Sequence, residues 1–171
     1  MLTNKEKVLK VFFDNPTGKF HIREIARKTC LNPNTILNIL DSLIKCKLLK
    51  REKKKHLVEV SALINQDFQR LKRVSNLQFL YDSGLVDFMV ERLIPESVSV
   101  IGSYSWGEDV ENSDVDIVVI SKKKEMLDLT NFEKKIGRKI HLIIADYETI
   151  SEEFYINLIN GVVLYGYLNK K

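Results

Sequence analysis

Two aspartates separated by one residue are the residues in this sequence most suited to chemistry. Asp114 and Asp116 lead into residues 117–120, an apolar run typical of a buried strand. Because side chains at i and i+2 lie on the same face of a strand, both carboxylates are expected to point the same way. Two like charges this close favour a shared divalent cation, and oxygen ligands suit Mg²⁺ or Mn²⁺. The pair therefore predicts a metal site.

A glycine and a serine after an earlier strand predict a phosphate-binding segment. Residues 98–101 read Val-Ser-Val-Ile and end at Gly102-Ser103. A turn at this glycine leaves backbone N–H groups and a hydroxyl unhindered, and such groups can hold a triphosphate.

Gly102-Ser103, Gly107 and Ser113-Asp114-x-Asp116 together resemble the fingerprint of the DNA polymerase beta-like nucleotidyltransferase superfamily in its minimal form. The resemblance covers roughly Leu85 to the C-terminus. It implies that Gly102, Ser103, Gly107 and Ser113 bind the nucleotide and that the two aspartates bind metal. The implied reaction moves a nucleoside monophosphate from an NTP to an acceptor hydroxyl, with two metal ions stabilising the attacking and leaving oxygens.

The sequence departs from that family pattern at two positions. Trp106 stands where many members have an arginine, and it could stack on a base, although covering core is the commoner use of tryptophan. His141 stands about where a third carboxylate is expected, and imidazole binds Mg²⁺ poorly compared with carboxylate. His141 is therefore either a catalytic group or an ordinary strand histidine, and Asp146 is a weaker substitute for the carboxylate.

The spacing of apolar residues predicts the elements around these side chains. Strands are expected over residues 98–101, 113–120, 138–144 and 161–167, and helices over 85–93 and 147–160. These elements predict an α+β domain with a small mixed sheet and flanking helices.

The first sixty residues are strongly basic. They hold 14 Lys and Arg against 6 Asp and Glu, whereas the rest of the chain is acidic. Helices are predicted over 4–13 and 23–28, and a third over 33–45, with Asn32 as N-cap and Pro33 as its first residue. Residues 48–60 then read as a hairpin with Lys53-Lys54-Lys55 at its tip. This order resembles a winged helix-turn-helix.

That resemblance implies contact with duplex DNA. The third helix would lie in the major groove and the hairpin near phosphates. Base edges would be contacted by Asn34, Thr35, Asn38 and Ser42, and phosphates by Lys50, Arg51, Lys53, Lys54 and Lys55. The alternative is a winged helix used for protein contact or dimerisation, which Asp41 on the same face slightly favours.

An apolar helical pattern over 63–93, interrupted at Ser83-Gly84, links the two parts. We expect a winged helix-turn-helix at 1–62, a connecting helix at 63–84 and a nucleotidyltransferase domain at 85–171. The connecting helix could also pair with its copy in a second chain, which makes a homodimer one alternative.

Composition favours a cytoplasmic protein with no membrane contact. The sequence has no apolar run long enough to span a bilayer and no signal-peptide pattern at its start. Cys30 and Cys46 are too few and too far apart for a zinc site, and both are expected to be core thiols.

Three functions remain open from the sequence. The first is a metal-dependent nucleotidyltransferase with a DNA-binding winged helix. The second is a DNA-binding transcriptional regulator whose degenerate transferase fold binds nucleotide without turnover, which His141 favours. The third is an antitoxin that acts through contact with a toxin partner.

Overall fold

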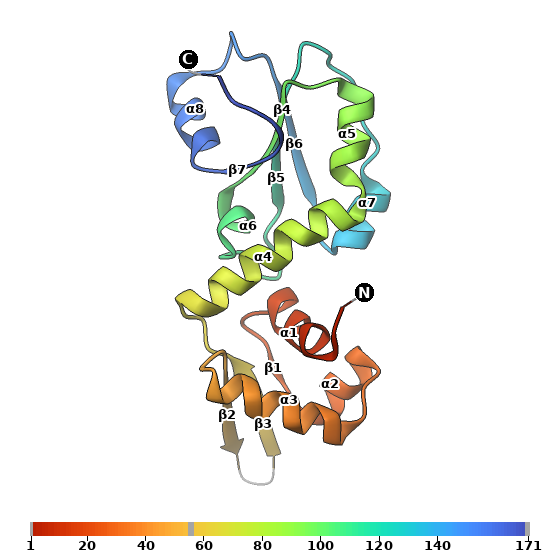
Figure 1. Ribbon diagram of the computed structural model, residues 1–171, viewed down its shortest axis with the longest axis vertical. Helices are drawn as coiled ribbons and strands as arrows, with labels where there is room; N and C mark the ends of the chain where they lie inside the picture. The colour runs from red at the N-terminus through yellow and green to blue at the C-terminus, as the bar shows by residue number, and fades with distance from the viewer. Residues whose placement is uncertain (1, 55–56, 170–171) are drawn as a thin grey trace. The chain divides into compact units, whose positions relative to one another are not determined.

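The computed structural model describes residues 2–54 and 57–169, and these form two compact units (Figure 1). The units comprise residues 1–72 and 73–171, so the boundary falls within helix α4 (Gln66–Ser83). Each unit combines helices with a small sheet, which confirms the α+β class. The expected division into 1–62, 63–84 and 85–171 stays a prediction.

The first unit has three complete helices, the start of α4 and a three-stranded antiparallel sheet of order β1-β3-β2. Its helices surround one apolar core, in which Phe12, Ile25 and Leu40 are fully buried. Its elements are α1 (Asn4–Asp14), β1 (Lys19–Phe20), α2 (Ile22–Thr29), α3 (Pro33–Lys45), β2 (Leu49–Lys54) and β3 (Leu57–Ala62).

Helix α3 begins where the sequence predicts. The Asn32 side chain accepts a hydrogen bond from the Asn34 backbone N–H at 2.9 Å, and Pro33 is the first helical residue. The two cysteines, by contrast, are exposed, so the expectation of core thiols was wrong. The reason is position, since Cys30 and Cys46 are the C-cap residues that directly follow α2 and α3 and lie outside the buried face of each helix.

The hairpin is longer than expected at its tip. Lys53 and Lys54 belong to β2, where they are register partners of Val58 and Leu57, so they are strand residues and not a loop. Lys55 and His56 lie outside the described residues.

The second unit is built on a four-stranded mixed sheet of order β6-β5-β4-β7. Strand β5 pairs antiparallel with β4 and parallel with β6, and β7 pairs antiparallel with β4. After α4, its elements are α5 (Leu85–Leu93), β4 (Ser97–Ile101), α6 (Gly102–Trp106), β5 (Val115–Ile120), α7 (Thr130–Ile136), β6 (Ile140–Ala145), α8 (Glu152–Ile159) and β7 (Val162–Gly166).

Helices cover both faces of this sheet. Val115 and Ile117 of β5 share a core with residues of α5 and α7, whereas Val118 and Ile120 pack with Leu158 of α8. Figure 1 shows α5 and α7 beside one face and α8 beside the other. Strand β7 lies at one end of the sheet order, and its Leu164 carbonyl accepts a hydrogen bond from the Tyr81 hydroxyl at 3.0 Å.

Several boundaries differ from those the sequence predicts. The linking helix starts at Gln66 because the Asn65 side chain accepts from the Phe68 N–H, and it breaks at Gly84 as expected. The helix expected over 147–160 starts only at Glu152, because Ser151 caps it. In the part of the chain that the structure describes, no helix is long and apolar enough to cross a membrane.

Candidate active site

The two motif aspartates lie at the start of β5. Asp114 precedes the strand by one residue and is exposed, so the expected strand over 113–120 begins two residues later than predicted. Asp116 is the second strand residue, and its side chain is 34% exposed. Both carboxylates are therefore accessible to a ligand from solvent.

The glycine of the motif lies directly against Asp116. Ile101 and Asp116 are register partners in the β4–β5 pair, and Gly102 follows with a positive φ of +69°. A Cβ atom at Gly102 would stand 2.8 Å from the Asp116 Oδ2 atom, so any other residue would force this carboxylate to move, and the positive φ also favours glycine. The two motif segments, about a dozen residues apart in sequence, therefore form one site.

Gly102 and Ser103 open a short helix rather than the expected turn. Helix α6 runs Gly102–Trp106 and ends at Gly107, which has a φ of +74°. The first N–H groups of a helix have no acceptor within the helix, so the backbone donors expected at these two residues are retained. The segment is therefore helical rather than a turn, and its backbone N–H donors are still present.

His141 lies beside Asp116 on the neighbouring strand. The two are register partners in the parallel β5–β6 pair, and the His141 Nδ1 atom is 3.0 Å from Asp116 Oδ1. An ionised carboxylate only accepts hydrogen bonds, so with Asp116 ionised the Nδ1 atom must carry the proton. The imidazole is 62% exposed, which leaves its other face open to solvent.

Asp146 does not join this group. It follows the last residue of β6, at the opposite end of that strand from His141. Its Oδ1 atom accepts a hydrogen bond from the Glu148 N–H at 3.0 Å and so closes a turn. The suggestion that Asp146 replaces the third carboxylate was therefore wrong.

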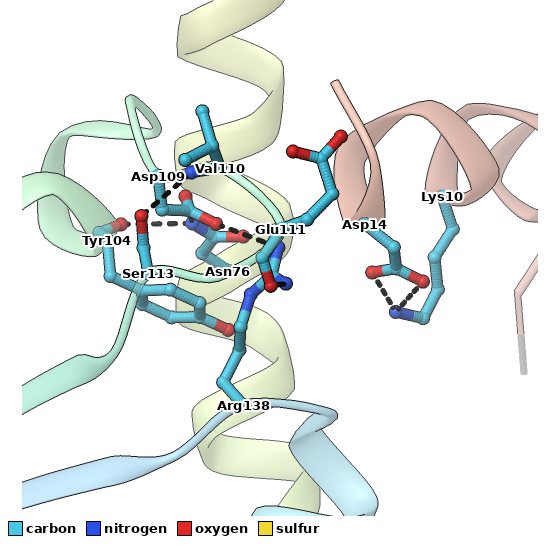
Figure 2. A network of polar contacts seen from close by, with 9 residues as sticks. All are labelled: Lys10, Asp14, Asn76, Tyr104, Asp109, Val110, Glu111, Ser113 and Arg138. Carbon is cyan, nitrogen blue, oxygen red and sulfur yellow. Dashed lines mark hydrogen bonds and ion pairs between the residues drawn. The ribbon is translucent and has the colours of Figure 1, made fainter. Parts of the chain in front are cut away.

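Ser113 closes a turn of the loop before β5. Its hydroxyl accepts a hydrogen bond from the Val110 N–H at 2.9 Å, as Figure 2 shows. This contact is within the loop and involves no ligand. The nucleotide-binding role of Ser113 therefore stays a prediction.

A buried polar network anchors the same loop, and sequence reasoning missed it (Figure 2). Arg138 forms an ion pair with Asp109, in which the two side chains are only 9% and 1% exposed, and it also donates to the Glu111 carbonyl. The Asn76 amide of α4 donates to Asp109 Oδ1 at 2.8 Å and to the Tyr104 carbonyl at 3.0 Å. No spacing or motif in the sequence singles out these residues, because they come from separate segments.

Trp106 is half exposed rather than buried in the core. Its side chain is 47% exposed, and the Arg73 guanidinium lies over its ring, 4.9 Å from the centroid. The expectation that tryptophan covers core was therefore wrong, because α6 directs it outward.

The residues expected to contact DNA lie on the surface of the first unit. Asn34, Asn38 and Ser42 are exposed on α3, and Thr35 is half buried. Lys50, Arg51 and Lys53 are exposed on β2, and Lys54 is the last residue of that strand. Lys55 lies outside the described residues.

Two of these basic residues are already paired. Arg51 Nη2 lies 2.8 Å from Asp41 Oδ1, and Lys50 Nζ lies 3.0 Å from Glu52 Oε1. The contacts of Glu52 with Lys50 and Lys19 lower the pKa of its carboxyl. Arg51 of β2 thus partly neutralises the negative charge of Asp41 on the α3 face.

The donor set of the second unit can hold a cation only with help from a ligand. Among residues 2–54 and 57–169, no group of three or more His, Cys, Asp and Glu side chains is placed to hold a metal ion. The carboxylates of Asp114 and Asp116 are nevertheless ligands of the type that suits Mg²⁺, which usually takes one or two carboxylates and completes its shell with water and substrate phosphates.

Comparison with known proteins finds one family match in the second unit. Residues 83–163 match the family model described as Nucleotidyltransferase domain. The matched range runs from the end of α4 into β7 and includes Gly102, Asp114, Asp116 and His141. A search of curated proteins finds no match.

Proposed function

We propose that the second unit is a metal-dependent nucleotidyltransferase that moves a nucleoside monophosphate from an NTP to an acceptor hydroxyl. The observation that carries this proposal is the close approach of Gly102 to Asp116, where a Cβ atom would come within 2.8 Å of the carboxylate. That approach brings phosphate-binding N–H groups and a metal-binding carboxylate to one place. The match of residues 83–163 to the nucleotidyltransferase model supports the same reaction class.

Each residue of the site has a distinct task in this proposal. The N–H groups of Gly102 and Ser103 hold the triphosphate, and Gly107 ends the helix that presents them. Asp114 and Asp116 hold Mg²⁺ or Mn²⁺, which when bound neutralises the charge of the triphosphate oxygens. His141 orients Asp116 through the contact between Nδ1 and Oδ1.

The reaction balances without any redox partner. The acceptor hydroxyl oxygen forms a bond to the α-phosphorus, and the bond from that phosphorus to its bridging oxygen breaks. Inorganic pyrophosphate leaves with the electron pair, and the hydroxyl proton passes to solvent. Because the chain offers His141 where a third carboxylate is expected, we expect this transfer to be slow.

The test is incorporation of α-³²P label from each of the four NTPs into the protein itself or into components of a cell extract. Mg²⁺ and Mn²⁺ are compared, together with Asp114→Ala and Asp116→Ala. Label that requires a divalent cation and both aspartates supports the proposal. Nucleotide binding without any label, in both the wild type and His141→Asp, would favour a regulator or antitoxin that binds nucleotide without turnover.

We also propose that the first unit is a winged helix-turn-helix that binds duplex DNA. The supporting observation is its element order, in which α3 is followed directly by the basic hairpin β2–β3. Exposed Asn34, Asn38 and Ser42 follow one another at four-residue spacing, so they form one row along α3. Binding by the full chain to mixed-sequence duplex DNA at low salt tests this. Contact of the same unit with a toxin protein or a second copy of the chain is the alternative if no DNA is bound.

A further inference from the structure

A hollow of about 460 Å³ opens beside Asp114 in the second unit. It lies between the loop that precedes β5 and the segment formed by α7 and the start of β6. A hollow of this size can enclose a small organic ligand. Its lining residues are Glu111, Asn112, Ser113, Asp114, Thr130, Glu133, Lys134, Gly137, Arg138 and Lys139.

The hollow is separate from the Gly102-Ser103 segment but shares Ser113 and Asp114 with the candidate site. Gly102, Ser103 and Asp116 are not among its lining residues, whereas Asp114 is. A ligand in the hollow can therefore approach Asp114 while a triphosphate occupies the Gly102-Ser103 segment. This is the arrangement that a second substrate requires.

The walls of the hollow are held in place before any ligand arrives. On one side, Arg138 ties the loop through the buried Asp109 carboxylate and the Glu111 carbonyl (Figure 2). On the other side, Glu133 accepts hydrogen bonds from the Ile140 N–H and from Lys139, both at 3.1 Å. A binding site that is already ordered loses less free energy when a ligand immobilises it.

The lining chemistry indicates the class of ligand. Three carboxylates and three basic side chains line the hollow, together with hydroxyl and amide groups and one glycine. The formal charge of the lining is therefore zero, and no lining residue is aliphatic or aromatic. The side chains of Asn112 and Asp114 have no hydrogen bond or ion pair to the described residues, so Asn112 is available to a ligand and Asp114 can contact a ligand, the proposed metal ion or both.

We propose that this hollow binds the acceptor of the transfer reaction and that the acceptor is a small, uncharged, hydroxyl-rich compound. This inference rests on the nucleotidyltransferase function proposed above. A carboxylate and an amide can accept from and donate to several hydroxyl groups at once. An aromatic acceptor such as a tyrosine side chain would find no ring to stack on, and a strongly charged acceptor would meet a lining of zero net charge.

In the transfer, one hydroxyl of this compound supplies the attacking oxygen. Its O–H bond breaks as the bond to the α-phosphorus forms, the proton passes to solvent, and pyrophosphate leaves from the NTP. Asn112 and Lys134 act on the acceptor only by binding it, so their removal should change KM far more than kcat.

Binding is tested on the full chain by amide chemical shifts with glycerol, myo-inositol and maltose at millimolar concentration, in the presence of Mg²⁺ and a non-hydrolysable NTP. We expect at least one probe to shift amides in residues 111–114 and 130–139. Asn112→Ala and Lys134→Ala should abolish these shifts, whereas Lys122→Ala, an exposed lysine outside the hollow, should not. Absence of shifts with all three probes, or shifts that persist in both variants, would overturn the inference.

Transfer is measured separately, so that failure of the two proposals can be told apart. With the probe that binds, Asn112→Ala should raise KM about tenfold through lost hydrogen bonds, with kcat and NTP binding little changed. Probe binding in the hollow without any transfer would overturn the proposed reaction and with it the acceptor role. Transfer to a tyrosine peptide but to none of the three probes would overturn the substrate class.

Discussion

Asp116 and His141 are register partners on adjacent parallel strands, and their side chains meet on one face of the sheet at 3.0 Å. The other carboxylate oxygen of Asp116 lies over Gly102, where a Cβ atom would stand only 2.8 Å away. The two oxygens therefore have different surroundings, one against an imidazole and one beside the phosphate-binding segment. One Asp116 oxygen is thus held by His141, and the other faces the proposed phosphate-binding segment. The first three predictions test the residues around these two oxygens.

Replacing Gly102 by alanine should abolish nucleotide binding. The added Cβ atom would collide with Asp116 Oδ2, and the positive φ would add about 1 kcal/mol of backbone strain. Gly84→Ala is the matched control, since Gly84 also has a positive φ but no atom within 4 Å of the added Cβ. Both variants should lose stability in urea, and only Gly102→Ala should lose binding of Mn²⁺ with a non-hydrolysable NTP in calorimetry. Equal binding by the two variants would contradict this account.

Removing both aspartates should abolish metal-dependent NTP binding. Asp114→Ala and Asp116→Ala each remove oxygen ligands from the proposed cation site, and titration calorimetry with Mg²⁺ or Mn²⁺ plus a non-hydrolysable NTP measures the loss. Glu91→Ala, which removes an exposed carboxylate from α5, serves as the control and should bind like the wild type. If the double variant binds as well as the wild type, the aspartates hold no metal.

Replacing His141 by aspartate should increase metal affinity or the rate of transfer. The change puts a charged oxygen ligand beside Asp116, at the position where we expect a third carboxylate from the resemblance. His141→Asn, which adds no charge, should not produce the gain. Label incorporation from α-³²P NTP is the measurement. Strong wild-type labelling that is lost in both Asp114→Ala and His141→Asp would instead make His141 a working catalytic group.

Breaking the buried ion pair should cost far more stability than breaking an exposed one. Arg138→Met leaves the buried Asp109 carboxylate without its positively charged partner, and we expect a loss of about 3–5 kcal/mol in the free energy of unfolding. Arg92→Met removes an exposed partner of Glu125 and should cost at most about 1 kcal/mol. Urea unfolding of both variants gives the two free energies of unfolding. Similar losses would show that the buried pair contributes no more to stability than the exposed one.

Alanine substitution in the hairpin should weaken the salt dependence of DNA binding. Each lysine that neutralises a phosphate contributes about −0.9 to the slope of log affinity against log salt. Lys53→Ala, Lys54→Ala and Lys55→Ala should therefore each reduce the slope by about 1 if the side chain contacts a phosphate. Lys5→Ala, an exposed lysine on α1, should leave the slope unchanged. A slope unaffected by all three changes would assign the hairpin to another role.

Local signals in the sequence predicted most elements of the fold. Asn32 and Pro33 marked the start of α3, and Gly84 marked the break between α4 and α5, because capping and helix propensity act over a few residues. The start of α8 was placed too early, since the apolar pattern of residues 147–150 continues that of the helix although Asp146 forms a turn there. Helix α7 was not predicted because its short sequence has only two large apolar residues.

The candidate site was predictable in its parts but not in its contacts. The sequence indicated Gly102, Asp114 and Asp116 through their types and spacing. The contact of His141 with Asp116 depends on strand register, and the Asp109–Arg138 pair depends on two loops that meet only in the folded chain. The periodicity of a sequence carries no information about such long-range contacts. These two contacts could therefore be identified only from the structure.

The hydrogen bond from Tyr81 to the Leu164 carbonyl has a consequence for how copies of this protein behave at high concentration. Strand β7 ends its sheet, and an end strand with free backbone groups can recruit strands from other molecules into aggregates. Tyr81 occupies one of those backbone acceptors, and the shift of register opposite Val98 and Ser99 makes the strand irregular. Together, the Tyr81 phenol of α4 and this irregularity make β7 a poor template for further strands.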